Sequence, residues 1–151
     1  MRGGGHDYAG NSSCDGGVLV DLSPMDSVHV DPVERVVRVG AGARWAAVDS
    51  ATQAFGLATP GGTVSSVGVS GFTLGGGVGH LGRLHGLACD NLVGARMVLA
   101  DGSEVQVGAD EHPDLFWAIR GGGGNFGVVT SMDLRLHEVG PQVLAGQLIH
   151  R

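Results

Sequence analysis

Short apolar runs with strand composition dominate the first quarter of the chain. Residues 18–22, 28–31 and 36–40 are rich in valine and are bounded by polar or turn-forming residues, as strands commonly are. The last two runs are joined by residues 31–35, which have the composition of a turn. We therefore expect three strands here, with a turn linking the last two.

Two later segments carry helical periodicity instead. Over residues 44–55, apolar side chains recur at helical spacing, and Gly56 follows where a left-handed C-terminal cap belongs. Residues 113–120 form a shorter helical segment, with proline in its first turn and glycine after its end. Each segment carries one tryptophan, Trp45 and Trp117, and we expect both in the core.

Strand patterns return in the second half of the chain. Residues 95–100 and 104–107 flank Asp101-Gly102, which is a strong hairpin signal, and residues 126–139 alternate like a half-buried strand. The strands and helices are mixed, with hairpins between strands. The pattern therefore predicts an α+β domain rather than a doubly wound parallel sheet.

Glycine is the compositional outlier of this chain. It supplies 29 of the 151 residues, against a usual share of about 7%. Most of the clusters lie in four loops, at residues 3–5, 60–62, 74–82 and 121–127. Glycine is favoured where φ is positive or where backbone approaches another group closely. These loops indicate backbone wrapped around a large ligand, for which a phosphate-bearing cofactor is the natural candidate.

Charge and cysteine content exclude several classes of protein. The net charge is −6 and the nine basic residues are scattered, which argues against nucleic-acid binding. No apolar run is long enough to cross a bilayer. Cys14 and Cys89 lack metal-binding or redox spacing, so we expect two reduced thiols and no metal site.

Two segments imitate a dinucleotide-binding fingerprint. Residues 77–82 and 122–127 both fit Gly-x-Gly-x-x-Gly. The first follows a glycine-rich loop rather than a strand, and the second leads into a strand rather than a helix, so we interpret both as decoys. A P-loop is excluded because the chain contains no lysine.

His6 is the strongest candidate for chemistry. It ends an Arg-Gly-Gly-Gly turn, where successive backbone N–H groups could form an anion-binding concavity. An imidazole at the rim of such a site can serve as a phosphate donor, an acid or base, or a nucleophile. Spacing alone leaves these three roles open. His80 and His85 are weaker candidates. The remaining histidines are expected to be solvated: His29, His112, His137 and His150.

An ordered series of motifs covers nearly the whole chain. They include Arg2-Gly-Gly-Gly-His-Asp-Tyr-Ala-Gly10, Phe55-Gly-Leu-Ala-Thr-Pro-Gly-Gly62, Gly68-Val-Ser-Gly-Phe-Thr-Leu-Gly-Gly-Gly-Val-Gly79, Arg83-Leu-His-Gly-Leu-Ala-Cys-Asp-Asn-Leu92, Asp114-Leu-Phe-Trp-Ala-Ile-Arg-Gly121 and Gly124-Asn-Phe-Gly-Val-Val-Thr130. Together they resemble the FAD-linked oxidases of the berberine bridge enzyme-like and 6-hydroxy-D-nicotine oxidase type. That resemblance implies a vanillyl-alcohol oxidase-like, PCMH-type FAD-binding domain.

The resemblance implies a set of cofactor-binding residues in three groups: the pyrophosphate loop (residues 2–10), the second glycine-rich segment (residues 62–79), and positions near the ribityl and adenine ends. These residues are Arg2, Gly3, Gly4, Gly5, His6, Asp7, Gly10, Gly62, Thr63, Gly68, Gly71, Thr73, Gly76, Gly77, Gly79, Asn91, Gly127 and Val128.

His6 matches the histidine that, in this family, bonds covalently to the flavin 8α-methyl group. Some members add a second bond from a cysteine at the position that Val64 occupies here, so attachment through His6 alone is expected. Val67 lies where the family gates oxygen access, and valine there favours an oxidase. The catalytic residues stay unassigned: the usual tyrosine base belongs to a substrate domain, and Tyr8, the only tyrosine, lies in the phosphate loop.

The resemblance also implies a partial domain. Residues 1–140 are expected to form the FAD-binding domain without its N-terminal half, and residues 141–151 to begin the substrate domain. The implied activity is hydride transfer from a small organic substrate to FAD and then to molecular oxygen, with no nucleic-acid or membrane partner.

Two other functions stay open. One is a non-catalytic FAD-binding fragment that needs missing segments or a partner chain, and the other is an FAD domain of the cell-wall precursor reductase type. Oligomeric state and compartment are undecided, with the cytoplasm slightly favoured.

Overall fold

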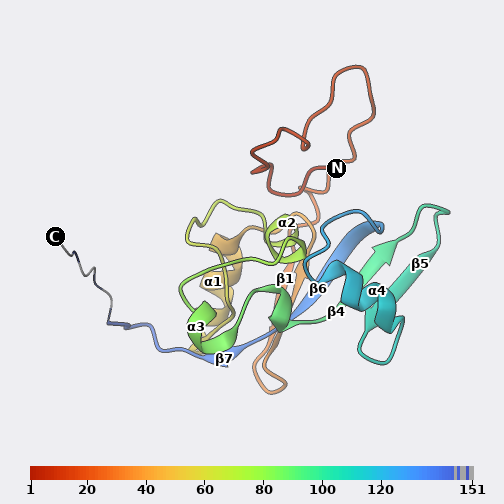
Figure 1. Cartoon of the computed structure of the whole chain (residues 1–151). Helices are drawn as coiled ribbons and strands as arrows, with labels where there is room; N and C mark the ends of the chain where they lie inside the picture. Colours follow the sequence, from red (N-terminus) through yellow and green to blue (C-terminus); the bar gives the residue numbers. More distant parts are fainter. Residues whose placement is uncertain (145, 147–148, 150–151) are drawn as a thin grey trace.

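The protein is built on a five-stranded antiparallel sheet, as seen in a computed structural model that describes residues 1–144, 146 and 149. A long N-terminal loop stands away from this body (Figure 1). In the segment 141–151, where the substrate domain is expected to begin, residues 145, 147, 148, 150 and 151 lie outside the described residues. No helix in the described part of the chain has the length and apolar character needed to span a membrane.

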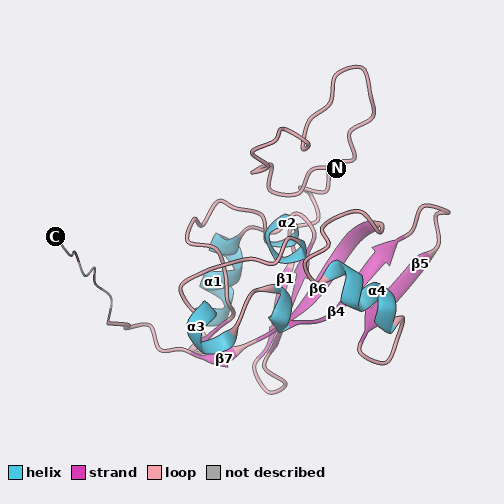
Figure 2. Ribbon diagram, in the orientation of Figure 1, coloured by secondary structure: helices cyan, strands magenta, loops and turns pink. Residues whose placement is uncertain are grey.

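Strands and helices mix along the chain, which confirms the α+β class (Figure 2). The strands are β1 (Val28–Asp31), β2 (Val36–Gly40), β3 (Leu57–Ala58), β4 (Leu92–Val98), β5 (Glu104–Gly108), β6 (Val128–Arg135) and β7 (His137–Glu138). The helices are α1 (Trp45–Gln53), α2 (Val69–Leu74), α3 (Gly82–His85) and α4 (Pro113–Ile119), with a 3-10 turn at Cys89–Asn91. The main sheet has the order β1-β2-β6-β4-β5, and β3 pairs separately with β7.

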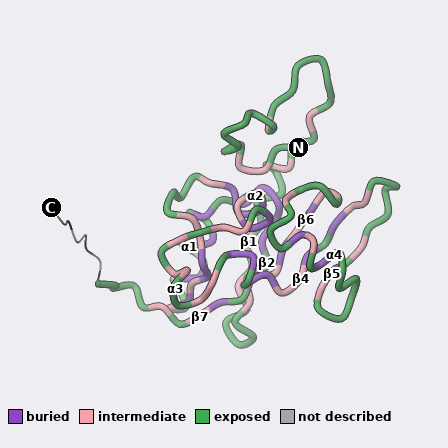
Figure 3. The backbone as a smooth tube through the Cα atoms, in the orientation of Figure 1, coloured by how far each residue is buried: buried purple, intermediate pink, exposed green. Residues whose placement is uncertain are grey.

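The core lies between one face of the main sheet and the helices. Val39 on β2 and Met132 on β6 are paired in register, and both are buried. The opposite face is polar: Arg38 and Asp133 pair across β2 and β6, with guanidinium–carboxylate distances of 2.7 and 2.8 Å. This alternation of buried and polar positions is what period-two strands with one covered face require. Figure 3 shows the buried segments gathered along the sheet.

Several expected elements are confirmed. α1 ends at Gln53 with Ala54 as its C-cap, earlier than expected, and Gly56 follows in the expected left-handed conformation, at φ +66°. β4 and β5 form the expected hairpin, with Gly102 at φ +84° in the turn. α4 begins at Pro113 as expected, and glycine follows its last turn.

Other expectations about these elements are wrong. Residues 18–22 do not form a strand of a sheet, and only Asp21 makes an isolated bridge, to Arg2. Val18 is 92% exposed, so no other described residue packs over its apolar side chain. Trp117 is also not in the core, since it is 77% exposed. α4 buries its Phe116 and Ile119 face, and Trp117 lies off that face.

α2 was not anticipated from the sequence. Its Val69, Ser70, Thr73 and Leu74 side chains are buried, but glycine stands at its N-cap, inside it and after it. Glycine has low helix propensity. Tertiary burial therefore stabilises a helix that local propensity disfavours.

Candidate functional site

The N-terminal glycine loop packs directly against the start of α2. A Cβ atom at Gly68 would lie 2.5 Å from the backbone nitrogen of Gly4, and one at Gly4 would overlap the Gly68 backbone in turn. A Cβ at Gly3 would lie 2.9 Å from the carbonyl oxygen of Ala41. Only glycine permits this approach of backbone to backbone. Residues 3–5 are thereby fixed on the body of the domain.

The same loop is anchored at Arg2. Its backbone N–H donates to the Val20 carbonyl oxygen at 2.9 Å, and its carbonyl accepts from the Leu22 N–H at 2.8 Å. The guanidinium lies 2.6 Å from the Asp21 carboxylate. The hydrogen bond from Arg2 lowers the pKa of Asp21 well below its usual range, and hydrogen bonds from Ser23 add to the effect. Asp21 therefore stays ionised and holds the arginine in place.

A cavity of about 370 Å³ opens beside this loop. Its lining residues are Arg2, Gly3, Gly4, Gly5, Ser12, Ser13, Ser23 and Arg44. Guanidinium groups, serine hydroxyls and glycine backbone suit an anionic ligand with several oxygen atoms, such as a phosphate. The serines and Arg44 were missed from the sequence, because isolated polar residues in loops carry no periodic signal.

His6 lies at the end of this loop, exposed, with its Nε2 atom 3.0 Å from the Ser66 hydroxyl. Ser66 was also missed, and nothing in its sequence context distinguishes it from Ser65. The turn that carries it is fixed on the start of α1: the Trp45 N–H donates to the Val67 carbonyl, and the Ala46 N–H to the Ser65 carbonyl. His6 therefore faces a turn of defined geometry.

The four glycine loops converge on α2. Residues 2–6 meet its first end at Gly68. At its other end, the N–H groups of Gly121 and Gly123 both donate to the Leu74 carbonyl, at 3.1 and 2.9 Å. Residues 60–62 reach its side, where a Cβ at Gly62 would lie 3.2 Å from the Phe72 ring. A helix absent from the sequence-based expectation thus organises the whole glycine-rich region.

The second glycine-rich segment closes mainly on protein atoms. A Cβ at Gly77 would lie 2.6 Å from the Phe72 ring, and one at Gly79 would overlap the Gly61 carbonyl. Gly76 and Gly77 both have positive φ, +106° and +80°. These glycines allow the loop after α2 to fold back, and their assignment to cofactor binding stays a prediction.

The other predicted positions are scattered around this centre. The Asp7 carboxylate accepts from the Asn11 N–H at 2.6 Å and Gly10 has φ +78°, so both shape the N-terminal loop. Thr63 is exposed, and the Thr73 hydroxyl is fully buried without a hydrogen-bond partner in the described chain. Val128 starts β6, paired with Val98 rather than with the other predicted residues.

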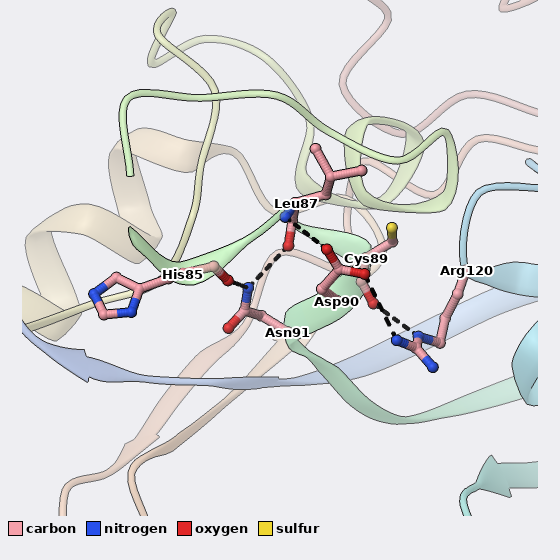
Figure 4. Close-up of polar contacts among 6 residues, drawn as sticks. All are labelled: His85, Leu87, Cys89, Asp90, Asn91 and Arg120. Carbon is pink, nitrogen blue, oxygen red and sulfur yellow. Dashed lines mark hydrogen bonds and ion pairs between the residues drawn. The ribbon is translucent and has the colours of Figure 1, made fainter. Parts of the chain in front are cut away.

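Asn91 holds the segment between α3 and β4. Its side-chain amide donates to the carbonyls of His85 (2.9 Å) and Leu87 (2.8 Å), as Figure 4 shows. Arg120 adds a second tie, donating from Nε to the Cys89 carbonyl at 3.0 Å. The Asn91 amide nitrogen is therefore committed to the fold, and its predicted contact with a cofactor stays a prediction.

Two histidines stack beside Asn91. The rings of His85 and His137 lie 3.8 Å apart and nearly parallel, and His137 Nε2 lies 2.7 Å from the Asn91 side-chain oxygen. The expectation that His137 is solvated is therefore wrong. Partial burial lowers the pKa of His137, and the nearby His85 and Arg135 lower it further.

This arrangement predicts a pH-dependent stability. Because the folded-state pKa of His137 lies below its unfolded value, the unfolded state binds the proton more readily. Neutral His137 therefore contributes stability that is fully present above its unfolded-state pKa, about 6.5. This contribution should be lost as the pH falls from there toward the lower folded-state pKa. We expect a lower melting temperature at mildly acidic than at neutral pH, and a flatter profile in His137→Gln. Equal slopes in the two proteins would contradict this assignment.

No group of three or more histidine, cysteine, aspartate or glutamate side chains within the described ranges is arranged to hold a metal ion. Cys14 is an exposed free thiol and Cys89 a buried one. Burial raises the pKa of the Cys89 thiol, and the neighbouring Asp90 raises it further. Cys89 is thus poorly suited to act as a thiolate.

Comparison with known proteins gives a consistent result. A family model described as "FAD binding domain" matches residues 1–108. A protein named FAD-dependent monooxygenase FUP4, from Fusarium proliferatum, is 49% identical over 142 residues, which are 93% of this chain and 28% of the relative.

Solved structures agree with this match. The crystal structure of 6-hydroxy-D-nicotine oxidase from Arthrobacter nicotinovorans superimposes with a TM-score of 0.89 at 43% identity, covering 91% of this chain and 30% of that one. Acremonium strictum glucooligosaccharide oxidase, whose structure is described as revealing a novel flavinylation, gives 0.82 at 40% identity, with coverage of 90% and 29%. This chain spans less than a third of the length of these relatives.

Proposed function

This chain belongs to the family of FAD-binding domains, and on that premise we propose that it is the FAD-binding part of a flavin-dependent oxidase. The proposed reaction passes a hydride from a small organic substrate to FAD, and molecular oxygen then reoxidises the flavin. Bound FAD supplies this redox chemistry, while the protein supplies binding and orientation. We further propose that residues 1–140 form this domain and that residues 141–151 begin the substrate domain.

The residues around the N-terminal loop fit the diphosphate of FAD. Gly3 and Gly4 bring backbone into contact with Ala41 and Gly68 and leave the loop edge open to the cavity. Arg44 lines the same cavity, as does Arg2, whose guanidinium is also paired with Asp21, and guanidinium groups bind phosphate oxygens well. This cavity, lined by the glycine backbone, Arg2, Arg44 and serine hydroxyls, is the observation that carries the proposal.

His6 is the proposed point of covalent attachment. Its imidazole is exposed at the end of the phosphate-binding loop, which leaves it accessible to a flavin ring whose diphosphate lies in the cavity. Val64 is 51% exposed and carries no nucleophile, so attachment through His6 alone is proposed. Val67 packs on the core beside this turn, and its valine is the basis for proposing an oxidase.

The second candidate is a non-catalytic FAD-binding fragment. In that function the chain would need further segments or a partner chain. Peroxide production with a reducing substrate separates the two functions. Covalent flavin separates both from a reductase-type FAD domain.

Acid denaturation of the purified, FAD-loaded protein tests the proposed function. We expect yellow colour that remains with the polypeptide after precipitation, and its complete loss in His6→Ala. The matched control is His80→Ala. His80 is an exposed histidine directly after the second glycine-rich segment, and this variant should keep the flavin. Flavin that washes away from the wild type would refute covalent attachment, and a failure to bind any flavin would refute FAD binding.

A further inference from the structure

We propose that Ser66 is the positioning residue for His6: it holds Nε2 of the imidazole so that Nδ1 presents its lone pair to the flavin. This inference rests on the proposed attachment of FAD through His6. Its starting point is the distance of 3.0 Å between the Ser66 hydroxyl oxygen and His6 Nε2, across 60 residues of sequence.

Both partners are held by backbone rather than by each other. His6 lies two residues after Gly4, which is in close backbone contact with Gly68. Ser66 stands between Ser65 and Val67, whose carbonyls accept the first two N–H groups of α1 at 2.9 and 3.1 Å. The exposed hydrogen bond therefore joins two anchored segments, and it has little backbone entropy left to overcome.

We take the Ser66 oxygen as the acceptor in this contact, and that choice determines which imidazole nitrogen can react. A neutral imidazole carries a proton on one nitrogen and a lone pair on the other. When the Ser66 oxygen accepts from Nε2–H, the lone pair lies on Nδ1, and that atom is the nucleophile. A partner on Nε2 also fixes the rotation of the ring, so that Nδ1 points away from the turn that carries Ser66.

A hydroxyl suits the whole course of the attachment. His6 Nδ1 forms a bond to the flavin 8α carbon, while one C–H bond of the methyl group and the Nε2–H bond break. The two protons and two electrons pass to the isoalloxazine, and dioxygen then takes them as hydrogen peroxide. Nε2 thus changes from donor to acceptor, and serine can follow because its hydroxyl both accepts and donates.

The test compares Ser66→Ala, Ser66→Thr and Ser65→Ala with the wild type, each produced from its complete reading frame. Flavin-free protein is mixed with FAD, and covalent adduct is followed by mass spectrometry. We expect attachment about tenfold slower in Ser66→Ala, because one hydrogen bond is lost. Threonine keeps the hydroxyl, and Ser65 lies next to it in the same exposed turn. Both control variants should attach flavin at the wild-type rate.

A second readout needs no flavin. NMR of the imidazole nitrogens reports the hydrogen bond to His6 Nε2 directly, and this signal should change in Ser66→Ala but not in Ser65→Ala. Unchanged attachment in Ser66→Ala, or an unchanged Nε2 signal, would overturn the role of Ser66 alone. A wild-type protein that forms no adduct would instead overturn covalent attachment itself, and this inference would fall with it.

Discussion

Replacing Trp45 with alanine should lower the free energy of unfolding by about 3–5 kcal/mol, the usual cost of emptying a large aromatic site. Trp45 is fully buried. Its ring packs edge-on against Phe72 with 5.4 Å between the ring centroids, and a Cβ at Gly61 would lie 2.8 Å from it. The indole thus fills the space between α1, α2 and the loop at residues 60–62, and alanine would leave a cavity there.

Trp117→Ala is the matched control, since it removes the same side chain from α4. Because Trp117 is 77% exposed, its loss should change stability by no more than about 0.5 kcal/mol. Urea unfolding followed by circular dichroism measures both variants. Similar losses of stability in the two variants would contradict the close packing described around Trp45.

Gly4→Ala should raise the dissociation constant for FAD by at least about tenfold, or abolish binding, while the sheet stays folded. The added methyl group would overlap the Gly68 backbone, and backbone cannot move aside as a flexible side chain can. Relieving such overpacking typically costs about 1–3 kcal/mol. The loop would therefore leave its position, carrying Arg2 and His6 away from the cavity.

Gly82→Ala is the control for this substitution. Gly82 begins α3, its φ is not in the left-handed region, and a Cβ there would meet nothing within 4 Å. Titration of flavin-free protein with FAD gives the dissociation constants, and melting curves report the fold. Equal affinity in Gly4→Ala and wild type would refute the proposed role of this loop.

The sequence predicted several elements whose signal is local, although the apolar run at residues 18–22 does not form the expected strand. α1 with the left-handed Gly56 that follows it, the β4–β5 hairpin, and the start of α4 at Pro113 each depend on residues within a few positions of one another. Failures came where distant contacts decide the outcome. Nothing local distinguishes buried Trp45 from exposed Trp117. Which side of a helix is buried depends on how that helix packs on the sheet.

The candidate site divides in the same way. Family motifs marked the Arg2–His6 loop, and their glycines do meet other backbone at close range. Ser66 and Arg44 could not be predicted, because only the folded chain brings them near the Arg2–His6 loop. α2 itself was hidden by the glycines that surround it.

The N-terminal loop also sets a hierarchy of local unfolding. Residues 7–20 are almost all exposed, and the contacts that tie the segment to the body are concentrated at Arg2, Gly3 and Gly4. Such a segment opens at a free-energy cost far below that of the whole domain. A ligand bound in the cavity that these residues line raises this cost through mass action. Amide hydrogen exchange in the loop would therefore slow with ligand occupancy, while exchange in β6, at the centre of the sheet, would hardly change.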